Sequence, residues 1–258
     1  MKRPSAAFLL ILLGFVLLTG CGGKEFEFQD AAQDASELYA KFKGHVDNAR
    51  FEIATKYFDE LESRYPFSPH SLQARLDLAY GYVLFGRPED AVSEADKFIR
   101  FNPTHKDVDY AYYIRGIANF GNRKQFLANW FPRNSSDFEL TSLHDAYNDF
   151  DFILRNFPNS RYAADARQRM VFLRNMFAEH EIHVAEYYIS RTAWVAAANR
   201  ANNVLHFYPT TPYNRDALEI LLQCYRKLGL DQSAADTEKI LQLNYPNDPK
   251  LQANGDES

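Results

Sequence analysis

The sequence predicts an all-helical protein, built as a solenoid of about five helix-turn-helix units. Three observations predict this fold: a proline recurs after an aromatic residue or Asn, its regular spacing is 37 residues, and an alanine stands twelve residues before each such proline. The recurring prolines are Pro66, Pro103, Pro158, Pro209 and Pro246. A fixed period of this length is typical of stacked supersecondary units rather than of one globular core.

The second helix of each unit is predicted by the residues that precede the proline. The alanines are followed, four and then three residues later, by mostly apolar side chains, so that all three positions lie on one helix face. In the first unit they are Ala54, Phe58 and Leu61. Gly86 and Gly229 fall midway between prolines and predict the turn between two helices. The pattern resembles the tetratricopeptide repeat; the alternative is five unrelated amphipathic helix pairs.

The amino-terminal end reads as an export signal. Lys2 and Arg3 precede an apolar run that is too short to span a membrane, and the run ends at Leu18-Thr19-Gly20-Cys21. This ending resembles the lipobox of bacterial lipoproteins, which predicts N-acyl and S-diacylglycerol lipid on Cys21 and no other cofactor. The alternatives are an ordinary secretory signal or a stop-transfer anchor.

The chain is therefore divided into a signal peptide, residues 1–20, and four further parts. We expect a lipidated flexible tether at 21–34, amino-terminal repeats at 35–158, carboxy-terminal repeats at 159–246 and a polar tail at 247–258. An Asp directly after the lipidated cysteine commonly retains a lipoprotein at the inner membrane, and this chain has Gly22 there. By that resemblance we expect the periplasmic face of the outer membrane.

One long spacing predicts a loop. Pro103 to Pro158 spans 55 residues, and the excess falls around Arg123–Ser142, where breakers and polar residues gather. Trp130 and Phe131 lie in this loop. They are candidate contacts for a partner, although aromatic residues of such a loop also pack commonly onto the repeats themselves.

A second long spacing predicts a long helix. Pro158 to Pro209 spans 51 residues, and the stretch from Asn159 to Tyr208 contains no Gly or Pro. The excess of 14 residues is close to four helical turns. We therefore expect one helix from about Ser160 to Ser190.

Composition and motifs exclude several functions. After removal of Lys2 and Arg3 the chain has 27 basic and 34 acidic residues, which argues against binding of nucleic acid. Glycine loops for phosphate and the common hydrolase motifs are absent from the sequence. His180 and His183 stand at i and i+3, but two ligands make a weak metal site. We therefore expect no metal site, no catalytic residues and no enzymatic activity, and we expect function to lie in surfaces that bind proteins.

Three runs carry a family resemblance. They are Arg64-Tyr65-Pro66-Phe67-Ser68-Pro69, Phe98-Ile99-Arg100-Phe101-Asn102-Pro103-Thr104-His105 and Val184-Ala185-Glu186-Tyr187-Tyr188. With them the chain resembles the BamD family (also called YfiO or ComL), lipoproteins of the outer-membrane β-barrel assembly machinery. The similarity covers about residues 35 to 246.

The resemblance implies partners rather than substrates. It implies binding to the periplasmic domains of a BamA-like barrel protein, to accessory lipoproteins of the BAM complex and to unfolded outer-membrane proteins. In the family an Arg after Asn in the fourth repeat pairs with an acidic residue of BamA, and Asn199-Arg200 matches that position. Tyr188 and Arg191 of the same repeat are included in the expected surface. The alternative function is a repeat-containing pilotin or envelope coordinator for a secretin or pilus system.

Overall fold

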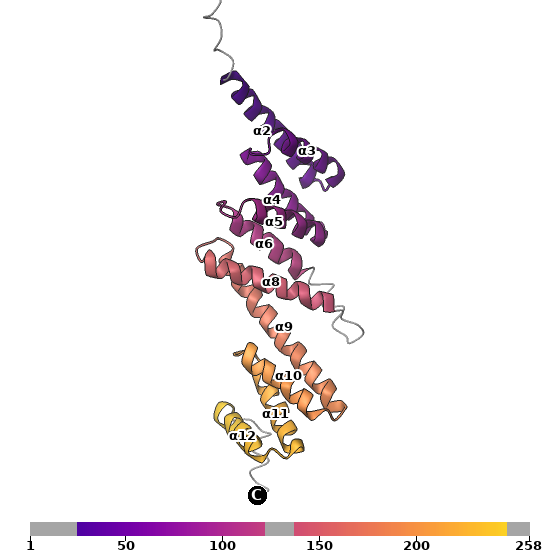
Figure 1. Ribbon diagram of the computed structural model, residues 1–258, viewed down its shortest axis with the longest axis vertical. Coiled ribbons are helices and arrows are strands. Elements are labelled where there is room, and N and C mark those ends of the chain that lie inside the picture. The colour runs from indigo at the N-terminus through magenta and orange to yellow at the C-terminus, as the bar shows by residue number, and fades with distance from the viewer. Residues whose placement is uncertain (1–24, 122–136, 247–258) are drawn as a thin grey trace, which may run out of the picture. The chain divides into compact units, whose positions relative to one another are not determined.

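The computed structural model describes residues 25–121 and 137–246, and it divides them between two compact units, Met1–Ser142 and Leu143–Ser258. The regular secondary structure of these ranges consists of ten α-helices (Figure 1). The all-helical prediction is therefore confirmed. None of the helices in the described ranges is long and apolar enough to cross a membrane.

The first unit contains two consecutive helix pairs and the first helix of a third. Its helices are α2 (Glu25–Asp47), α3 (Phe51–Arg64), α4 (Pro69–Leu84), α5 (Pro88–Phe101) and α6 (Val108–Phe120). Helix α3 ends just before Pro66 and α5 just before Pro103, as the proline spacing predicts. Ser68 caps α4, because its hydroxyl accepts a hydrogen bond from the backbone N–H of His70 and Pro69 occupies the first turn.

The second unit continues the same order. Its helices are α8 (Asp137–Asn156), α9 (Ala163–Ser190), α10 (Trp194–Phe207), α11 (Asn214–Leu228) and α12 (Asp231–Asn244). The long helix expected from about Ser160 to Ser190 is confirmed by α9, which has 28 residues. The ten helices thus match the five predicted units in order and in position.

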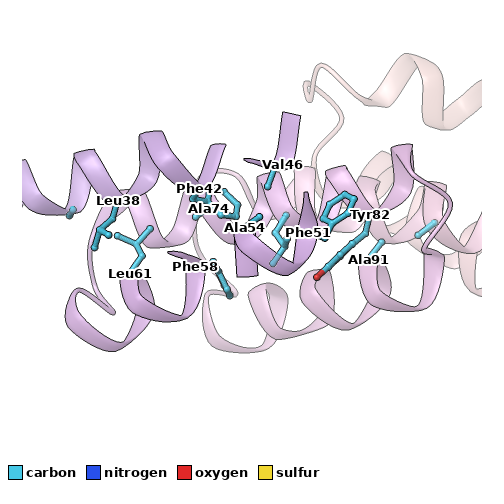
Figure 2. Close-up of a cluster of buried hydrophobic side chains, with 13 residues drawn as sticks. Leu38, Phe42, Val46, Phe51, Ala54, Phe58, Leu61, Ala74, Tyr82 and Ala91 are labelled. Atoms are coloured by element: carbon cyan, nitrogen blue, oxygen red, sulfur yellow. The ribbon is translucent and has the colours of Figure 1, made fainter. Parts of the chain in front are cut away.

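Alanines let the helices of the first unit approach closely. Ala54 and Ala91 are completely buried, and Phe42, Phe58 and Leu61 fill the space around them (Figure 2). Gly81 serves the same purpose, because a Cβ there would lie 2.8 Å from Cγ1 of Val46. Small residues at these positions are therefore required by helix packing.

We expect Ala91→Leu to destabilise the protein by about 1–3 kcal/mol, because the added methylenes must force two packed helices apart. Thermal unfolding followed by circular dichroism measures the effect. The matched control is Ala235→Leu on α12, since Ala235 is exposed. Equal melting temperatures for the two variants would mean that the predicted repeat register is wrong.

The turns within the first, second, fourth and fifth helix pairs share a residue with a positive φ angle. Gly86 and Gly229 have positive φ angles of 72° and 68°, as expected for glycine turns. Ala49 and Thr192 take the equivalent positions in the first and fourth pairs with φ of 57° and 58°. The turn geometry is therefore retained where the sequence has no glycine to signal it.

Small residues also fill the core of the second unit. Ala185, Ala197 and Ala201 are completely buried where α9 packs against α10. Cys224 is buried in the same cluster as a free thiol. Burial raises the pKa of this thiol, so it behaves as a small apolar side chain.

Three boundaries differ from the sequence-based expectations. Helix α2 begins at Glu25, so that most of the expected tether 21–34 is helical. Helix α8 begins at Asp137, inside the expected loop Arg123–Ser142. The compact units divide the sequence between Ser142 and Leu143, whereas the expected division was between 158 and 159. The reason is that α8 packs on α9, where the rings of His144 and Phe177 stack with centroids 4.1 Å apart.

Candidate partner-binding site

The fourth helix pair, α9 and α10, holds a cluster of three polar side chains. Nη1 of Arg200 donates to Oε1 of Glu181 at 3.2 Å, and Nδ2 of Asn203 donates to Oε2 of Glu181 at 3.0 Å. Arg200 and Asn203 stand at i and i+3 on α10, so that both side chains face the same part of α9. One carboxylate from α9 is therefore held by two donors from α10.

The members of this cluster differ in their exposure to solvent. The Glu181 side chain is 13% exposed, whereas the Arg200 side chain is 40% exposed. Nε and Nη2 of Arg200 form no hydrogen bond with the part of the chain that the structure describes. A guanidinium presents its donors as a planar fork that matches a carboxylate. Arg200 thus has one edge held by Glu181 and another edge available for a second carboxylate.

His180 lies beside this cluster. Burial lowers its pKa, Arg200, His183 and His144 lower it further, and Glu181 opposes the change. The folded protein therefore binds the His180 proton less readily than the unfolded chain does. Stability from this group is fully present above the unfolded pKa of 6.5 and is lost as the pH falls below that value.

We expect His180→Gln to reduce the loss of stability on acidification. The measurement is the free energy of unfolding, from urea titrations, at about pH 7.5 and at about pH 5.5 for the variant and the unmodified protein. His183→Gln provides the control, because it removes an imidazole that is exposed rather than buried. An identical pH dependence in the His180 variant and the unmodified protein would contradict this assignment.

Arg191 and Tyr188 lie at the end of α9 and in the turn that follows it, whereas Arg200 lies on α10. Arg191 is exposed in the turn after α9, and its guanidinium lies 4.9 Å from the ring centroid of Tyr187. Tyr188 packs against the core of the second unit, and its carbonyl oxygen accepts the backbone N–H groups of Arg191 and Ala193. Arg200 lies nearly two helical turns into α10.

Asn199 is exposed beside Arg200 on α10, as the sequence-based prediction requires of a contact residue. Cys21, Trp130 and Phe131 lie outside the described residues. Their expected roles, lipid attachment for Cys21 and loop contact for the two aromatic residues, stay predictions.

Glu181 and Asn203 were missed as site residues in the sequence. A signal for them exists in the repeat register. Glu181 and Arg200 stand 28 and 9 residues before Pro209, and the same distances before Pro103 lead to Arg75 and Glu94. Both pairs are ion pairs between the two helices of one unit, with the charges reversed.

The described side chains do not gather into a metal site. Across residues 34–121 and 140–246, no group of three or more His, Cys, Asp or Glu side chains is arranged to hold a metal ion. His183 instead lies near Glu186 and Glu179, at 3.4 and 4.0 Å. The chemistry available in the cluster of Glu181, Arg200 and Asn203 is recognition of a carboxylate.

Comparison with known proteins decides the family. The family model YfiO, described as an outer membrane lipoprotein, matches residues 31–241. The chain belongs to the YfiO family of outer membrane lipoproteins. Several relatives of this chain are named "Outer membrane protein assembly factor BamD". One of them, from Xylella fastidiosa (strain 9a5c), is 39% identical over 96% of this chain and 85% of its own length.

Two further relatives carry the same name. The protein of Neisseria meningitidis serogroup A is 38% identical over 94% of this chain and 92% of its own length. The protein of Vibrio cholerae is 34% identical over 90% of this chain and 96% of its own length. The similarity to the YfiO family therefore extends over nearly the whole of each protein.

Solved structures with a similar course of the chain are more distant. The tetratricopeptide domain of P58(IPK) is 15% identical, with a TM-score of 0.43 over 90% of this chain and 58% of that chain. PilW, described as a type IV pilus biogenesis factor, is 16% identical, with a TM-score of 0.33 over 85% of this chain and 81% of that chain. Scores at this level do not bear on the function of a YfiO protein.

Proposed function

We propose that the protein is a lipid-anchored scaffold subunit of the β-barrel assembly machinery, the BAM complex. The single observation that carries this proposal is the near full-length similarity to relatives named outer membrane protein assembly factor BamD. In this function the chain binds a BamA-like barrel protein, engages unfolded outer-membrane proteins for insertion, and contacts accessory BAM lipoproteins. It does so as a binding protein and not as an enzyme, and lipid is its only covalent group.

The lipid on Cys21 is proposed to hold the chain at the periplasmic face of the outer membrane. Each buried CH₂ contributes about 0.8 kcal/mol, so three acyl chains anchor a protein that one chain would hold only transiently. Membership of a family of outer membrane lipoproteins supports this location.

The free edge of Arg200 is proposed as a contact with an acidic side chain of the barrel protein. Its exposure supports this contact, as do its donors Nε and Nη2, which bind no other residue of the described ranges. Asn199 and Arg191 are exposed and are included in the proposed surface, and the carbonyl of Tyr188 accepts the backbone N–H groups of the turn that carries Arg191.

The decisive experiment is recovery of carboxy-terminally tagged protein from detergent-solubilised envelopes, followed by mass spectrometry. We expect a large barrel protein with periplasmic repeats to be recovered in near-equal amount. The mass of the amino-terminal peptide reports at the same time whether Cys21 carries lipid. Recovery of a secretin or pilus subunit without such a barrel would assign the chain to the alternative function.

We expect Arg200→Glu to weaken binding of the barrel protein at least about tenfold, because the variant places like charges opposite each other. The measurement is retention of the barrel protein at matched salt, with helicity checked by circular dichroism. The control is Arg155→Glu on α8, where Arg155 is 75% exposed and pairs with Asp151 one turn earlier on the same helix. Equal retention by both variants would remove Arg200 from the proposed site.

A further inference from the structure

Among the residues that the structure describes, the second and the fourth helix pair carry an ion pair at the same place in the repeat. In the second pair, Nη1 of Arg75 on α4 donates to Oε2 of Glu94 on α5 at 2.5 Å. In the fourth pair, Arg200 on α10 donates to Glu181 on α9. The acid also has a second donor in each case, Lys97 in the second pair and Asn203 in the fourth. Lys97 and Asn203 both stand six residues before the recurring proline.

The arginine of the second pair is bound at both terminal nitrogens and is mostly buried. Nη2 of Arg75 donates to Glu62 on α3, and the guanidinium lies 5.1 Å from the ring centroid of Phe58. The side chains of Arg75 and Glu94 are each 12% exposed. This pair therefore holds helices together, and little of either side chain reaches solvent.

Within the described ranges, the arginine of the fourth pair is bound on one edge only. Both contacts to Glu181 come from Nη1, and the side chain of Arg200 is 40% exposed. The carboxylate that holds it is nearly as buried as Glu94, and it is fixed a second time by Asn203. In the fourth pair the acid is on the first helix and the arginine is on the second, the reverse of the second pair. The buried acid there holds one edge of an arginine whose other edge faces solvent.

From this contrast we infer that Glu181 and Asn203 are positioning residues, which hold Arg200 so that its free edge meets a carboxylate of the partner while Glu181 stays bound. The inference rests on the proposed function, in which Arg200 contacts an acidic side chain of the barrel protein. Glu181 is not displaced on binding, because Asn203 retains it and little of it reaches solvent. The guanidinium has enough donors to serve both carboxylates.

A held arginine binds better than a free one, because less side-chain freedom is lost when the partner arrives. Removing the charge of Glu181 should therefore weaken binding of the partner. If Glu181 instead competed with the partner's carboxylate for Arg200, removing its charge should strengthen binding. The sign of the change separates positioning from competition.

The test is a double-mutant cycle on the full chain, with the purified periplasmic domains of the recovered barrel protein as the probe. We expect Glu181→Gln to weaken binding about three- to tenfold. In an Arg200→Ala background the same substitution should have no further effect, because its only route to the partner is gone. A purely structural role would persist in that background, and tighter binding by Glu181→Gln would establish competition; either result overturns the inference.

Asn203→Ala is the second variant, and it guards against a loss of folding in Glu181→Gln. It leaves the ion pair in place and removes only the amide donor to Glu181, so that weaker binding by a smaller factor is expected. If Glu181→Gln and Asn203→Ala both leave binding unchanged, and Arg200→Glu still weakens it, the inference is overturned. Unchanged binding in Arg200→Glu itself would instead contradict the contact in the proposed function.

Discussion

Phe98→Ala should lower the free energy of unfolding by about 3–5 kcal/mol, the range found when a buried aromatic side chain is removed. Phe98 on α5 is completely buried and packs with Leu76, Ala111 and Ile114 from the two neighbouring helices. The edge of its ring also meets His105, with centroids 5.3 Å apart. These neighbours are fixed on two helices and in the turn between α5 and α6, so the resulting cavity can collapse only in part.

Urea denaturation followed by circular dichroism measures this effect, and Phe101→Ala provides the control. Phe101 lies on the same helix one turn later and is 72% exposed. Its removal should cost less than about 0.5 kcal/mol, as for most surface positions. Similar losses for the two variants would mean that α5 does not face α4 and α6 as described.

Much of the fold could be predicted from the sequence because helix packing depends on residue size at fixed spacings. Ala54, Ala91 and Ala197 are completely buried, because two helices can approach closely only where side chains are small. Helix α9 was predictable from the absence of Gly and Pro over its length. Each of these features depends on neighbours within one repeat, so a single sequence contains it.

Turns and boundaries were less predictable, because packing can impose a backbone conformation that the residue itself does not favour. Thr192 has a positive φ of 58°, although β-branched residues rarely adopt that region. The surrounding hydrogen bonds fix this turn: the N–H of Ala193 donates to the carbonyl of Tyr188. The sequence signals Gly86 and Gly229 as turns but not Thr192.

The candidate site was predicted in part. Arg200 was named from the resemblance of Asn199-Arg200 to a family position, and its role as a contact stays a prediction. Glu181 was not found, because it is 19 residues away and sits between two histidines that suggest a metal. Pairing across two helices depends on which faces meet, and that information lies in the three-dimensional arrangement.

The repeat register connects the site to the fold. The same two positions hold Arg75 and Glu94 in one unit and Glu181 and Arg200 in another. Helix pairing in the solenoid therefore tolerates either order of charge at this place. Of these two pairs, the one with the acid on the first helix leaves its guanidinium exposed. A pair of positions that holds two helices together can therefore also present an arginine to a partner.

Arg75→Met should destabilise the protein by about 2–4 kcal/mol, because it removes the cation that two carboxylates share. Loss of one partner from a buried pair costs about 3–5 kcal/mol. The expected cost is smaller here because Glu62 is 36% exposed and can turn to solvent, while Lys97 still neutralises part of the charge of Glu94. Met keeps most of the side-chain volume against Phe58, so the effect reports charge rather than packing.

The control for this variant is Arg64→Met, where Arg64 is 49% exposed and pairs with Glu60 one turn away. Surface pairs of this kind contribute at most about 1 kcal/mol. Adding Glu94→Gln to Arg75→Met should recover part of the lost stability, since the buried carboxylate left without its arginine is removed. If instead the double variant were less stable than Arg75→Met, the cost would lie in lost hydrogen bonds, and the ion pair would not be what holds the second helix pair together.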